Sequence, residues 1–582
     1  MSLIKLTEVS TLSKNKILGI DLGTSTSEIA LLEEGKPRVI PNQLGEYMTP
    51  SVVGLSDSGE IIIGKEARDQ LLLKPEDTVM EVKRLMGSND MLSMGGKKYT
   101  PQRISAYILS YLIDCARRHL NEEIDRAVIT VPAYFSDTQR RATVEAGKLA
   151  GISVERIINE PTAAALDYGL EHVRENQHIL IYDLGGGTLD VTVLEMFSGV
   201  LEVKASCGNN RLGGKDFDQK LVDYLLDRFA AQYGKRVAGD KRALMRLKEA
   251  AEKCKIALSK EDEYQLTIPF FANIEGNPVS MEETVSRETF EGLIKDLIDS
   301  TVKPIDTALS DARLKASDID LVLLVGGSSR IPYVRRFIEK TLGQAPRPLV
   351  DPDLTVVRGA AIQAGILGEQ LSAENDILIT DVCPYTLGTS VLAFLGGVPL
   401  SDAYDVIIPR NVTIPTVKEK IYETVADGQT RVMIDVYQGE FKKASHNNFL
   451  GKVLLDGIPP APAFQEKISI RFAYDANGIL QVEGTIISTG KKAGLTIETT
   501  GANMIAEVDT EGWEEAPHAR RYKAFIKKAT RMIKNGKAQF YALEMESLIR
   551  KIKIGLIQGE DLSALDELKE QLHEMIYDIT EE

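Results

Sequence analysis

The sequence predicts a multidomain protein in which an α/β region, an all-β region and a short helical region follow one another. From residue 16 to about 369, short β-branched runs alternate with longer helical patterns, which is typical of layered α/β domains. From 384 to about 500, the helical patterns give way to short strands separated by turn dipeptides. Beyond that, apolar residues recur at three- and four-residue spacing, as in amphipathic helices.

Individual elements can be placed within these regions. In the first region we expect strands over 127–132 and 321–325, and a helix that follows Ser136. In the second, the turns are expected at Gly396-Gly397, Asp427-Gly428, Asp456-Gly457, Asn477-Gly478 and Thr489-Gly490. In the third, one helix is marked by Tyr522, Phe525, Ile526, Ala529, Met532 and Ile533, and a later one by Leu562, Leu565, Leu572 and Ile576.

A repeated motif is the strongest functional signal in the chain. An apolar run ends at Asp21, and a second ends at Asp183, and each is followed by small residues that lead into another apolar run, as in a β-hairpin. Glycines let backbone N–H groups approach an anion closely, hydroxyls donate hydrogen bonds, and an aspartate can hold Mg²⁺ through its water shell. The small residues are Gly23, Thr24, Ser25, Thr26, Gly185, Gly186 and Gly187. Either hairpin alone could be an ordinary glycine-rich turn, but two copies could grip one triphosphate from both sides.

A third glycine-rich turn follows the strand that ends at Val325. Gly326, Gly327, Ser328 and Arg330 could lay backbone against adenosine and phosphate near a helix N-terminus. The two standard nucleotide motifs, the G-x-x-x-x-G-K-[ST] P-loop and a G-x-G-x-x-G after a strand, do not occur.

The composition limits the classes of partner. The 582 residues are 43% hydrophobic and 26% charged, which is ordinary for several globular domains. A net charge of −16 disfavours nucleic-acid binding. The four cysteines have no C-x-x-C spacing, which fits a reducing cytoplasm, and no apolar run is long enough to span a membrane. Residues 1–15 are expected to be a leader outside the fold.

Several strings together resemble the seventy-kilodalton heat-shock chaperones of the DnaK type. They are residues 21–27, 131–135, 159–165, 183–190 and 326–332, followed by 376–381 and, in the β region, 439–440 and 456–462. Within the family, the chain is most similar to the bacterial HscC branch, on the evidence of residues 45–47, residues 380–385 and the short tail. The resemblance implies an actin-like two-lobed ATPase over 16–372, a linker over 373–383, a β-sandwich peptide-binding domain over 384–507 and a short helical lid over 508–582.

The resemblance also implies roles in a slow, Mg²⁺-dependent ATP hydrolysis, and it allows K⁺ as a further ion. Asp21 and Asp183 would hold Mg²⁺ through water, and Lys83 would reach the γ-phosphate and the attacking water. Glu160, Thr188 and Asp190 would orient that water. Without the resemblance, Lys83 would be read as a solvated surface lysine.

Further positions of the resemblance would contact adenosine and phosphate. They are Gly214, Glu252, Lys255, Ser259, Gly326, Gly327, Ser328, Arg330 and Asp353. Ile256 stands where many eukaryotic members have an arginine, so adenine binding would depend more on apolar packing. Asn210 and Lys215 depart from the usual threonine and glutamate, which leaves the contacts from that lobe open.

In the β region, the resemblance implies that an extended peptide binds at a strand edge, with one apolar side chain in a pocket. The matching positions are Thr389, Leu392, Tyr422, Val425, Val432 and Ile434. Each of them alone could equally be sandwich core. At Thr389 an apolar residue is usual, so its hydroxyl should alter the preference for leucine-like side chains.

The resemblance assigns the coupling between the regions to a linker and its neighbours. Ile377, Leu378 and Ile379 would dock on the ATPase when ATP is bound, although they could also be an ordinary strand. Pro132 and Arg140 would relay the signal, and Arg156, Asn159 and Asp381 would form the surface for a J-domain co-chaperone. The sequence leaves open whether a nucleotide exchange factor is also needed.

The expected function is therefore an ATP-dependent chaperone that binds and releases unfolded or extended polypeptides. A specialised regulator that holds one partner is the alternative, because Thr389 and the short tail could narrow the specificity. A metabolite kinase would not need the β region or the linker. The short tail predicts looser closure and faster peptide exchange than in relatives with a long lid.

Overall fold

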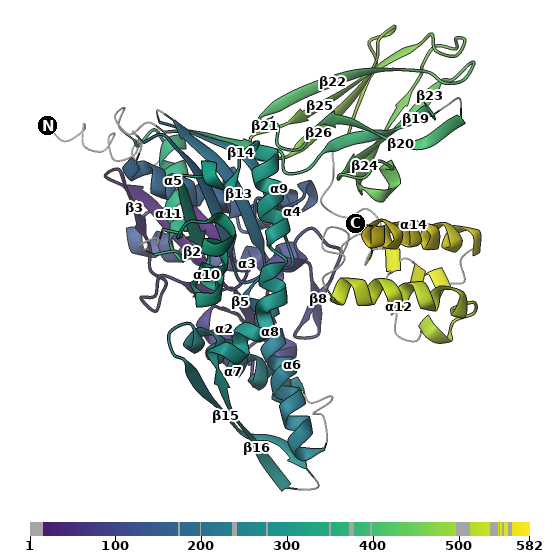
Figure 1. The fold of residues 1–582 in the computed structure, drawn as a ribbon. Coiled ribbons are helices and arrows are strands. Elements are labelled where there is room, and N and C mark those ends of the chain that lie inside the picture. Colours follow the sequence, from purple (N-terminus) through teal and green to yellow (C-terminus); the bar gives the residue numbers. More distant parts are fainter. Residues whose placement is uncertain are drawn as a thin grey trace, which may run out of the picture. The chain divides into compact units, whose positions relative to one another are not determined.

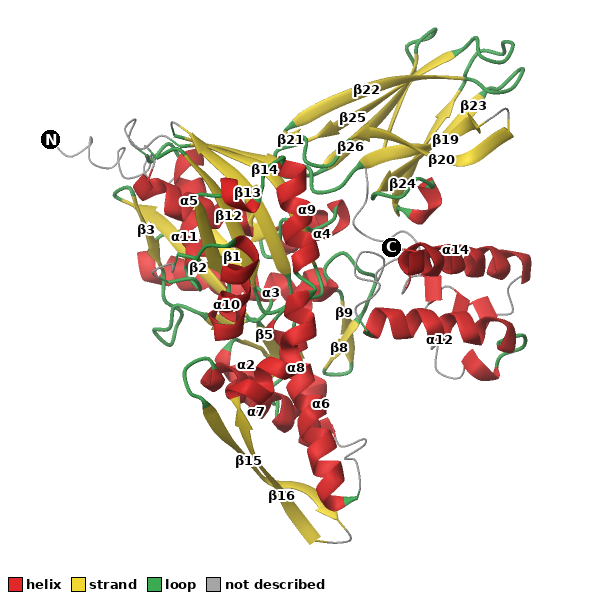
Figure 2. Ribbon diagram, viewed as in Figure 1, coloured by secondary structure: helices red, strands yellow, loops and turns green. Residues whose placement is uncertain are grey.

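The computed structural model describes most of the chain (Figures 1 and 2). The described residues are 16–581 apart from 173–174, 198, 235–240, 275–276, 348–350, 372–376, 396–397, 496–512, 536–544, 546–547, 550–551, 554 and 557–561. The expected leader, and the expected boundary between sandwich and lid, lie outside this part of the chain. The chain divides into two compact units, the first comprising Met1–Pro384, Asn411–Thr416 and Tyr474–Ile479, and the second the remainder.

The first unit contains two sheets with the same arrangement of strands. In one sheet, β1 (Leu18–Leu22) pairs antiparallel with β2 (Thr26–Glu33) and parallel with β10 (Arg126–Val131). In the other, β12 (Gln177–Leu184) pairs antiparallel with β13 (Leu189–Phe197) and parallel with β17 (Leu321–Val325). The repeated motif of the sequence is therefore the β1–β2 turn of one lobe and the β12–β13 turn of the other. This is the predicted two-lobed ATPase architecture.

The remaining elements of the first unit complete the two lobes. The strands are β3 (Lys36–Val39), β4 (Thr49–Pro50), β5 (Val52–Leu55), β6 (Ile61–Ile63), β7 (Thr78–Met80), β8 (Leu92–Met94), β9 (Lys97–Tyr99), β11 (Ser153–Asn159), β14 (Val200–Asn209), β15 (Glu263–Ile274) and β16 (Asn277–Ser286). The helices are α2 (Lys65–Gln70), α3 (Pro101–Leu120), α4 (Asp137–Leu149), α5 (Glu160–His172), α6 (Gly214–Tyr233), α7 (Lys241–Leu258), α8 (Arg287–Asp299), α9 (Val302–Ala312), α10 (Pro332–Leu342) and α11 (Thr355–Leu367). Figure 2 shows β15 and β16 as a long hairpin that extends past α7.

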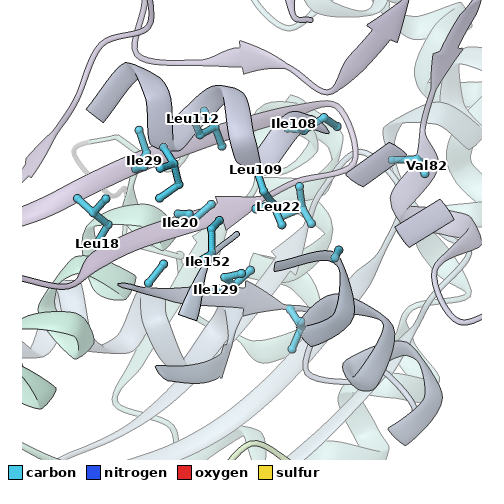
Figure 3. Close-up of a cluster of buried hydrophobic side chains, with 14 of the residues drawn as sticks. Leu18, Ile20, Leu22, Ile29, Val82, Ile108, Leu109, Leu112, Ile129 and Ile152 are labelled. Carbon is cyan, nitrogen blue, oxygen red and sulfur yellow. The ribbon is translucent and has the colours of Figure 1, made fainter. Parts of the chain in front are cut away.

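A buried apolar cluster fixes the first lobe around β1 (Figure 3). Leu18, Ile20 and Leu22 of β1 pack with Leu109 and Leu112 of α3, and all five side chains are almost fully buried. Burial of each side chain of this size stabilises the fold by about 1.5 to 3 kcal/mol. The cluster therefore holds the end of β1, and with it Asp21, in a fixed position.

Two glycines bring α11 close to both lobes. A Cβ at Gly359 would lie less than 3.0 Å from the backbone of Ala163 in α5, and a Cβ at Gly19 would lie equally close to the backbone of Ala361. A larger residue at either position would push α11 away from its neighbours.

The predicted helix after Ser136 is confirmed as α4, where Ser136 and Gln139 form a capping box.

Two of the three apolar residues of the expected linker, Leu378 and Ile379, lie in a strand of the second sheet. β18 (Leu378–Val382) pairs in parallel with β14, with Leu378 opposite Val200 and Thr380 opposite Glu202. Its other edge pairs with β21 (Thr413–Ile414). The side chain of Ile377 is 3% exposed, whereas that of Leu378 is 61% exposed. Leu378 and Ile379 thus belong to a strand, and the assignment of this segment as an interdomain linker stays a prediction.

The second unit contains two four-stranded sheets, as the β-sandwich prediction requires. One has the order β20-β19-β23-β24 and the other β22-β25-β26-β27. The bounds are β19 (Leu387–Leu395), β20 (Val398–Ile408), β22 (Thr416–Glu423), β23 (Arg431–Gln438), β24 (Asn448–Asp456), β25 (Lys467–Tyr474), β26 (Leu480–Ile486) and β27 (Lys492–Leu495). Gly484 of β26 lies against Ile434 of β23, so the two sheets face each other. The turn glycines 428, 457, 478 and 490 have φ between 67° and 84°, while 396 and 397 lie outside the described residues.

The helical tail follows the predicted spacing. α12 (Arg520–Lys534) and α14 (Leu562–Glu581) pack together through a core that includes Tyr522, Ile526 and Leu572. No helix in the described part of the chain has the length and apolar character needed to cross a bilayer.

Candidate active site

The two acidic hairpins of the first unit face each other. A Cβ at Gly186, in the β12–β13 turn, would lie less than 3.0 Å from the hydroxyl oxygen of Ser25 in the β1–β2 turn. A Cβ at Gly187 would similarly meet Thr24 at 3.1 Å. Only glycine at positions 186 and 187 leaves room for Ser25 and Thr24 of the other hairpin. Both turns therefore present backbone and hydroxyl groups to the same small space.

Buried carboxylates converge behind these turns. Asp183 and Asp190 are opposite each other in the β12–β13 ladder, and both are almost fully buried. Burial, followed by the charge of Glu160, raises the pKa of Asp190 to about 7, although Tyr134 N–H donates to its Oδ1. Burial and the neighbouring carboxylates also raise the pKa of Asp183 well above its ordinary value. The other oxygen of Asp190, Oδ2, is buried without a hydrogen bond, so it can still accept one from a bound water or coordinate a cation.

Lys83 is the buried cation of this group. It lies in the short 3₁₀ helix Val82–Leu85, is 5% exposed, and donates a hydrogen bond to Glu160 at the start of α5. Burial opposes its charge, but Glu160, Asp21 and Asp183 together raise the pKa of Lys83 above its ordinary value. Asp21 accepts a 2.6 Å hydrogen bond from the hydroxyl of Thr130. One ammonium thus stands among several carboxylates, an arrangement that an additional bound cation would balance.

The third glycine-rich turn contacts the second hairpin. Ser328 donates a 2.8 Å hydrogen bond to the carbonyl of Gly185, and Gly326 lies against Leu184 and Asp183 with φ of 79°. Arg330 forms a 2.6 Å ion pair with Asp353, which also lies near Gly327. The structure therefore brings this turn to the same site, as the sequence predicts.

Residues of α6 and α7 complete the surroundings. Lys255 pairs with Asp218 at 2.8 Å and lies close to Gly214, and Ser259 follows one turn later. Burial alone would raise the pKa of Glu252, but Lys215 and Arg68 lower it. Lys215, the departure from the family pattern, thus forms an ion pair with Glu252 at 3.2 Å. Ile256 is 57% exposed, so its side chain is free to contact an apolar ligand surface.

The structure adds site residues that the sequence reasoning missed. Arg84 donates to the carbonyl of Gly187 and pairs with Asp216 at 2.6 Å. Glu28 is 2% exposed, directly opposite Asp21 in the β1–β2 ladder, and its Oε1 has no hydrogen-bond partner. A charged residue inside a strand whose other internal residues are apolar or hydroxyl-bearing was the signal for Glu28. Nothing in the sequence marked Arg84 beyond its place next to Lys83.

A chain of hydrogen bonds runs from β18 to the acidic site. Asn159 Nδ2 donates to Asp381 at 2.7 Å, and Arg140 donates to Asn159 Oδ1 at 2.7 Å. Arg140 also donates to the carbonyl of Ala133, between Pro132 and Tyr134. Asn159 directly precedes Glu160, and Tyr134 N–H bonds Asp190. The predicted coupling residues are thus contiguous with the predicted catalytic residues.

Arg156 lies near Asp381 and Asp475.

The six predicted peptide-binding residues differ in exposure. Ile434 and Thr389 are buried, Val432 and Tyr422 are intermediate, and Leu392 and Val425 are 38% and 48% exposed. Thr389 donates a 2.7 Å hydrogen bond to the carbonyl of Asp435, and Tyr422 donates a 2.6 Å hydrogen bond to Asp405. The hydroxyl of Thr389 is thus already satisfied by the neighbouring strand.

Comparison with known proteins decides the family. The family profile described as "Hsp70 protein" matches residues 17–93 and 89–582. The chain belongs to the Hsp70 family. This Hsp70 chain is 45% identical over 570 residues to the chaperone protein DnaK of Thermotoga neapolitana. The aligned residues cover 97% of the chain and 92% of the relative. It is 44% identical, with the same coverage, to the DnaK proteins of Thermotoga petrophila and Thermotoga maritima.

The family resemblance expected from the motifs is confirmed. This Hsp70 protein is an ATPase and an ATP-dependent molecular chaperone, as its motifs, its fold and the agreement over nearly its whole length establish. Closeness to the HscC branch within the family stays a prediction.

Proposed function

We propose that the acidic site hydrolyses Mg²⁺-bound ATP with the residues named from the sequence. Asp21 and Asp183 hold the ion through water, Lys83 contacts the γ-phosphate, and Glu160, Thr188 and Asp190 orient the attacking water. The single observation that carries this proposal is the buried excess of carboxylates over the one lysine, with Asp190 Oδ2 left without a partner. Bound Mg²⁺ would neutralise charge on the phosphates. K⁺ is a candidate for a second cation at the same site.

The glycine-rich turns support the rest of the nucleotide assignment. Gly23 to Thr26 and Gly185 to Gly187 surround the phosphates from two sides, and Gly326 to Ser328 with Gly214 surround the adenosine. Lys255, Glu252 and Ser259 contribute from α7, and Arg330 and Asp353 from the third turn. What supports this division is that the three turns and α6 approach one another closely enough to exclude side chains.

We further propose that nucleotide state sets the affinity of the β-sandwich for extended polypeptides. The hydrogen bonds from Asp381 through Asn159 and Arg140 to the acidic site support this coupling. The polypeptide lies against Leu392, Val425 and the four neighbouring predicted positions. The same Arg156, Asn159 and Asp381 surface is the candidate for a J-domain co-chaperone, and a nucleotide exchange factor is a further candidate partner. The cytoplasm is the expected compartment, in keeping with four buried cysteine thiols.

The test is the affinity of a fluorescent apolar peptide, measured by anisotropy with ADP and with ATP. We expect ATP to weaken binding by about 5- to 150-fold, the usual range of allosteric coupling. Asp381→Ala should remove this difference while ATP binding remains. Equal peptide affinity with both nucleotides in the unaltered protein would refute the proposal. A peptide array then separates a general chaperone, which binds many apolar sequences, from a regulator that holds one partner.

A further inference from the structure

Helix α12 is strongly basic in an acidic protein. Its sequence, RRYKAFIKKATRMIK, contains seven lysines and arginines and no acidic residue, while the whole chain has a net charge of −16. The apolar side of the helix is buried in the bundle with α14. Lys527, Lys528 and Arg531 are consequently exposed to solvent. The helix thus forms a local positive surface on which an anionic partner is attracted rather than repelled.

A pocket of about 380 Å³ opens beside this helix. Its apolar lining includes Trp513 and Ile526, and its cations are Lys527, Arg531 and Lys553. Lys553 lies over the ring of Trp513, with its nitrogen 5.4 Å from the ring centre. The pocket therefore combines an aromatic wall with three positive charges.

One carboxylate also lines the pocket, and it is already paired. Glu514 forms an ion pair with Lys523 and lies 3.6 Å from Lys527. Within the described part of the chain, the guanidinium of Arg531 makes no hydrogen bond or ion pair, and it can therefore bind a carboxylate in two-pronged geometry. The net charge of the lining remains positive after Glu514 is counted.

We propose that this pocket binds an acidic segment of a partner polypeptide in which one aromatic or branched apolar residue stands among aspartates and glutamates. The apolar residue packs on the accessible part of Trp513, and the flanking carboxylates pair with Arg531, Lys527 and Lys553. A polypeptide fits better than a nucleic acid or an anionic membrane, because a long polyanion would also meet the acidic remainder of the chain. The pocket shares no residue with the predicted peptide-binding positions of the β-sandwich, and it selects acidic segments rather than purely apolar ones.

The chain supplies its own reporter for a test, because Trp513 is its only tryptophan. The full-length protein with ADP is titrated with the octapeptide Glu-Asp-Glu-Phe-Glu-Asp-Glu-Asp, and with its Gln/Asn counterpart that keeps the phenylalanine. We expect a saturable change in tryptophan emission with the acidic peptide and at least a tenfold weaker response to the neutral one. A labelled copy of the acidic peptide, followed by anisotropy, gives the same affinity independently of the reporter.

Matched variants distinguish the pocket from general charge attraction. The double substitution Lys527→Glu with Arg531→Glu should weaken the acidic peptide by about tenfold or more. Lys528→Glu, on the same helix but outside the pocket, should change the affinity less than threefold. Circular dichroism checks that both variants keep their helices, and an apolar peptide bound by the β-sandwich should not be displaced.

Three outcomes would overturn the proposal. Equal weakening by Lys528→Glu would show diffuse attraction to the helix, and unchanged binding in the double variant would exclude the pocket. A single-stranded oligonucleotide or phosphatidylserine vesicles that shift Trp513 emission at lower concentration than the acidic peptide would assign the surface to another class of partner. None of these outcomes bears on ATP hydrolysis or on the β-sandwich, so they leave the proposed function intact.

Discussion

Ser25 and Gly186 face each other so closely that the hydroxyl of one occupies the space where a side chain of the other would begin. They belong to different lobes and lie far apart in the sequence. This contact sets the separation of the two hairpins, and it makes the proposed phosphate site sensitive to a single methyl group.

Gly186→Ala should therefore push the hairpins apart. We expect ATP affinity, measured by calorimetry, to fall by about one to two orders of magnitude, which corresponds to the 1 to 3 kcal/mol cost of overpacking a closely packed site. Gly292→Ala in α8 is the matched control, because nothing lies within 4 Å of its added Cβ. Wild-type affinity in Gly186→Ala would mean that the hairpins do not enclose the nucleotide.

Lys83→Met should separate hydrolysis from binding. We expect the single-turnover hydrolysis rate to fall by about 10²- to 10³-fold, because a positive charge on the developing transition state is lost, while ATP affinity changes less than about tenfold. The variant should also be less stable by about 3 to 5 kcal/mol, because Glu160 loses its buried partner. Glu160→Gln added to Lys83→Met should restore part of this stability. Lys220→Met, an exposed lysine of α6, controls for loss of charge.

Two neighbouring residues of the expected linker should respond differently to the same substitution. Ile377→Asp places a carboxylate where the side chain is 3% exposed, whereas Leu378→Asp places it where the side chain is 61% exposed. Peptide stimulation of ATP turnover should be lost in the first variant and reduced less than twofold in the second. The basal rate without peptide serves as the reference. Equal behaviour of the two variants would show that docking of β18 on β14 does not carry the signal.

Glu28→Gln should alter the pH dependence of stability. Burial, followed by the charge of Asp21, raises the pKa of Glu28 well above its ordinary 4.5. The folded state therefore holds this proton more tightly than the unfolded state, so the unaltered protein loses stability as pH rises above 4.5, until the raised pKa is passed. The glutamine variant lacks this loss. In urea denaturation without nucleotide, its advantage should grow by about 1 to 3 kcal/mol between pH 5 and pH 8. Parallel pH profiles would contradict the assignment.

Thr389→Val should change the preference of the β-sandwich. The substitution keeps the shape of the side chain but removes the hydrogen bond to Asp435, so we expect about 1 kcal/mol lower stability. A leucine-centred peptide should bind about three- to tenfold more tightly relative to a serine-centred one, because a methyl group replaces the hydroxyl at the predicted peptide-binding position. Ser390→Ala, one position along the strand and hence on the other face, should leave this ratio unchanged.

The order of the three regions could be predicted from the sequence. So could the helices and strands that are marked by the spacing of their own apolar residues. The strand over 321–325 and the helix with Tyr522 and Ile526 follow from apolar spacing alone, and the facing of the hairpins follows from their repetition. The hydrogen bond that Asn159 donates to Asp381 could not be predicted from spacing, because it joins segments more than two hundred residues apart. Here the family resemblance named the residues, and only the structure gave the contacts.

Arg84 and Glu28, two site residues outside the motifs, show a second limit of prediction from the sequence. Arg84 contacts Gly187 and Asp216 across long sequence separations, and no local pattern distinguishes it from a surface arginine. The burial of Glu28 depends on how β2 pairs with β1, and a charged residue in a strand is usually assigned to the solvent face.

The docking of β18 has a consequence for the energetics of release. β14 would be an open edge of its sheet if β18 were absent, with a row of unpaired amides and carbonyls. When β18 detaches, the backbone groups of β14 and β18 that pair with each other must form hydrogen bonds with water instead. The exposed edge of β14 can then pair with any other extended chain. The covering strand thus also protects the ATPase from unwanted association.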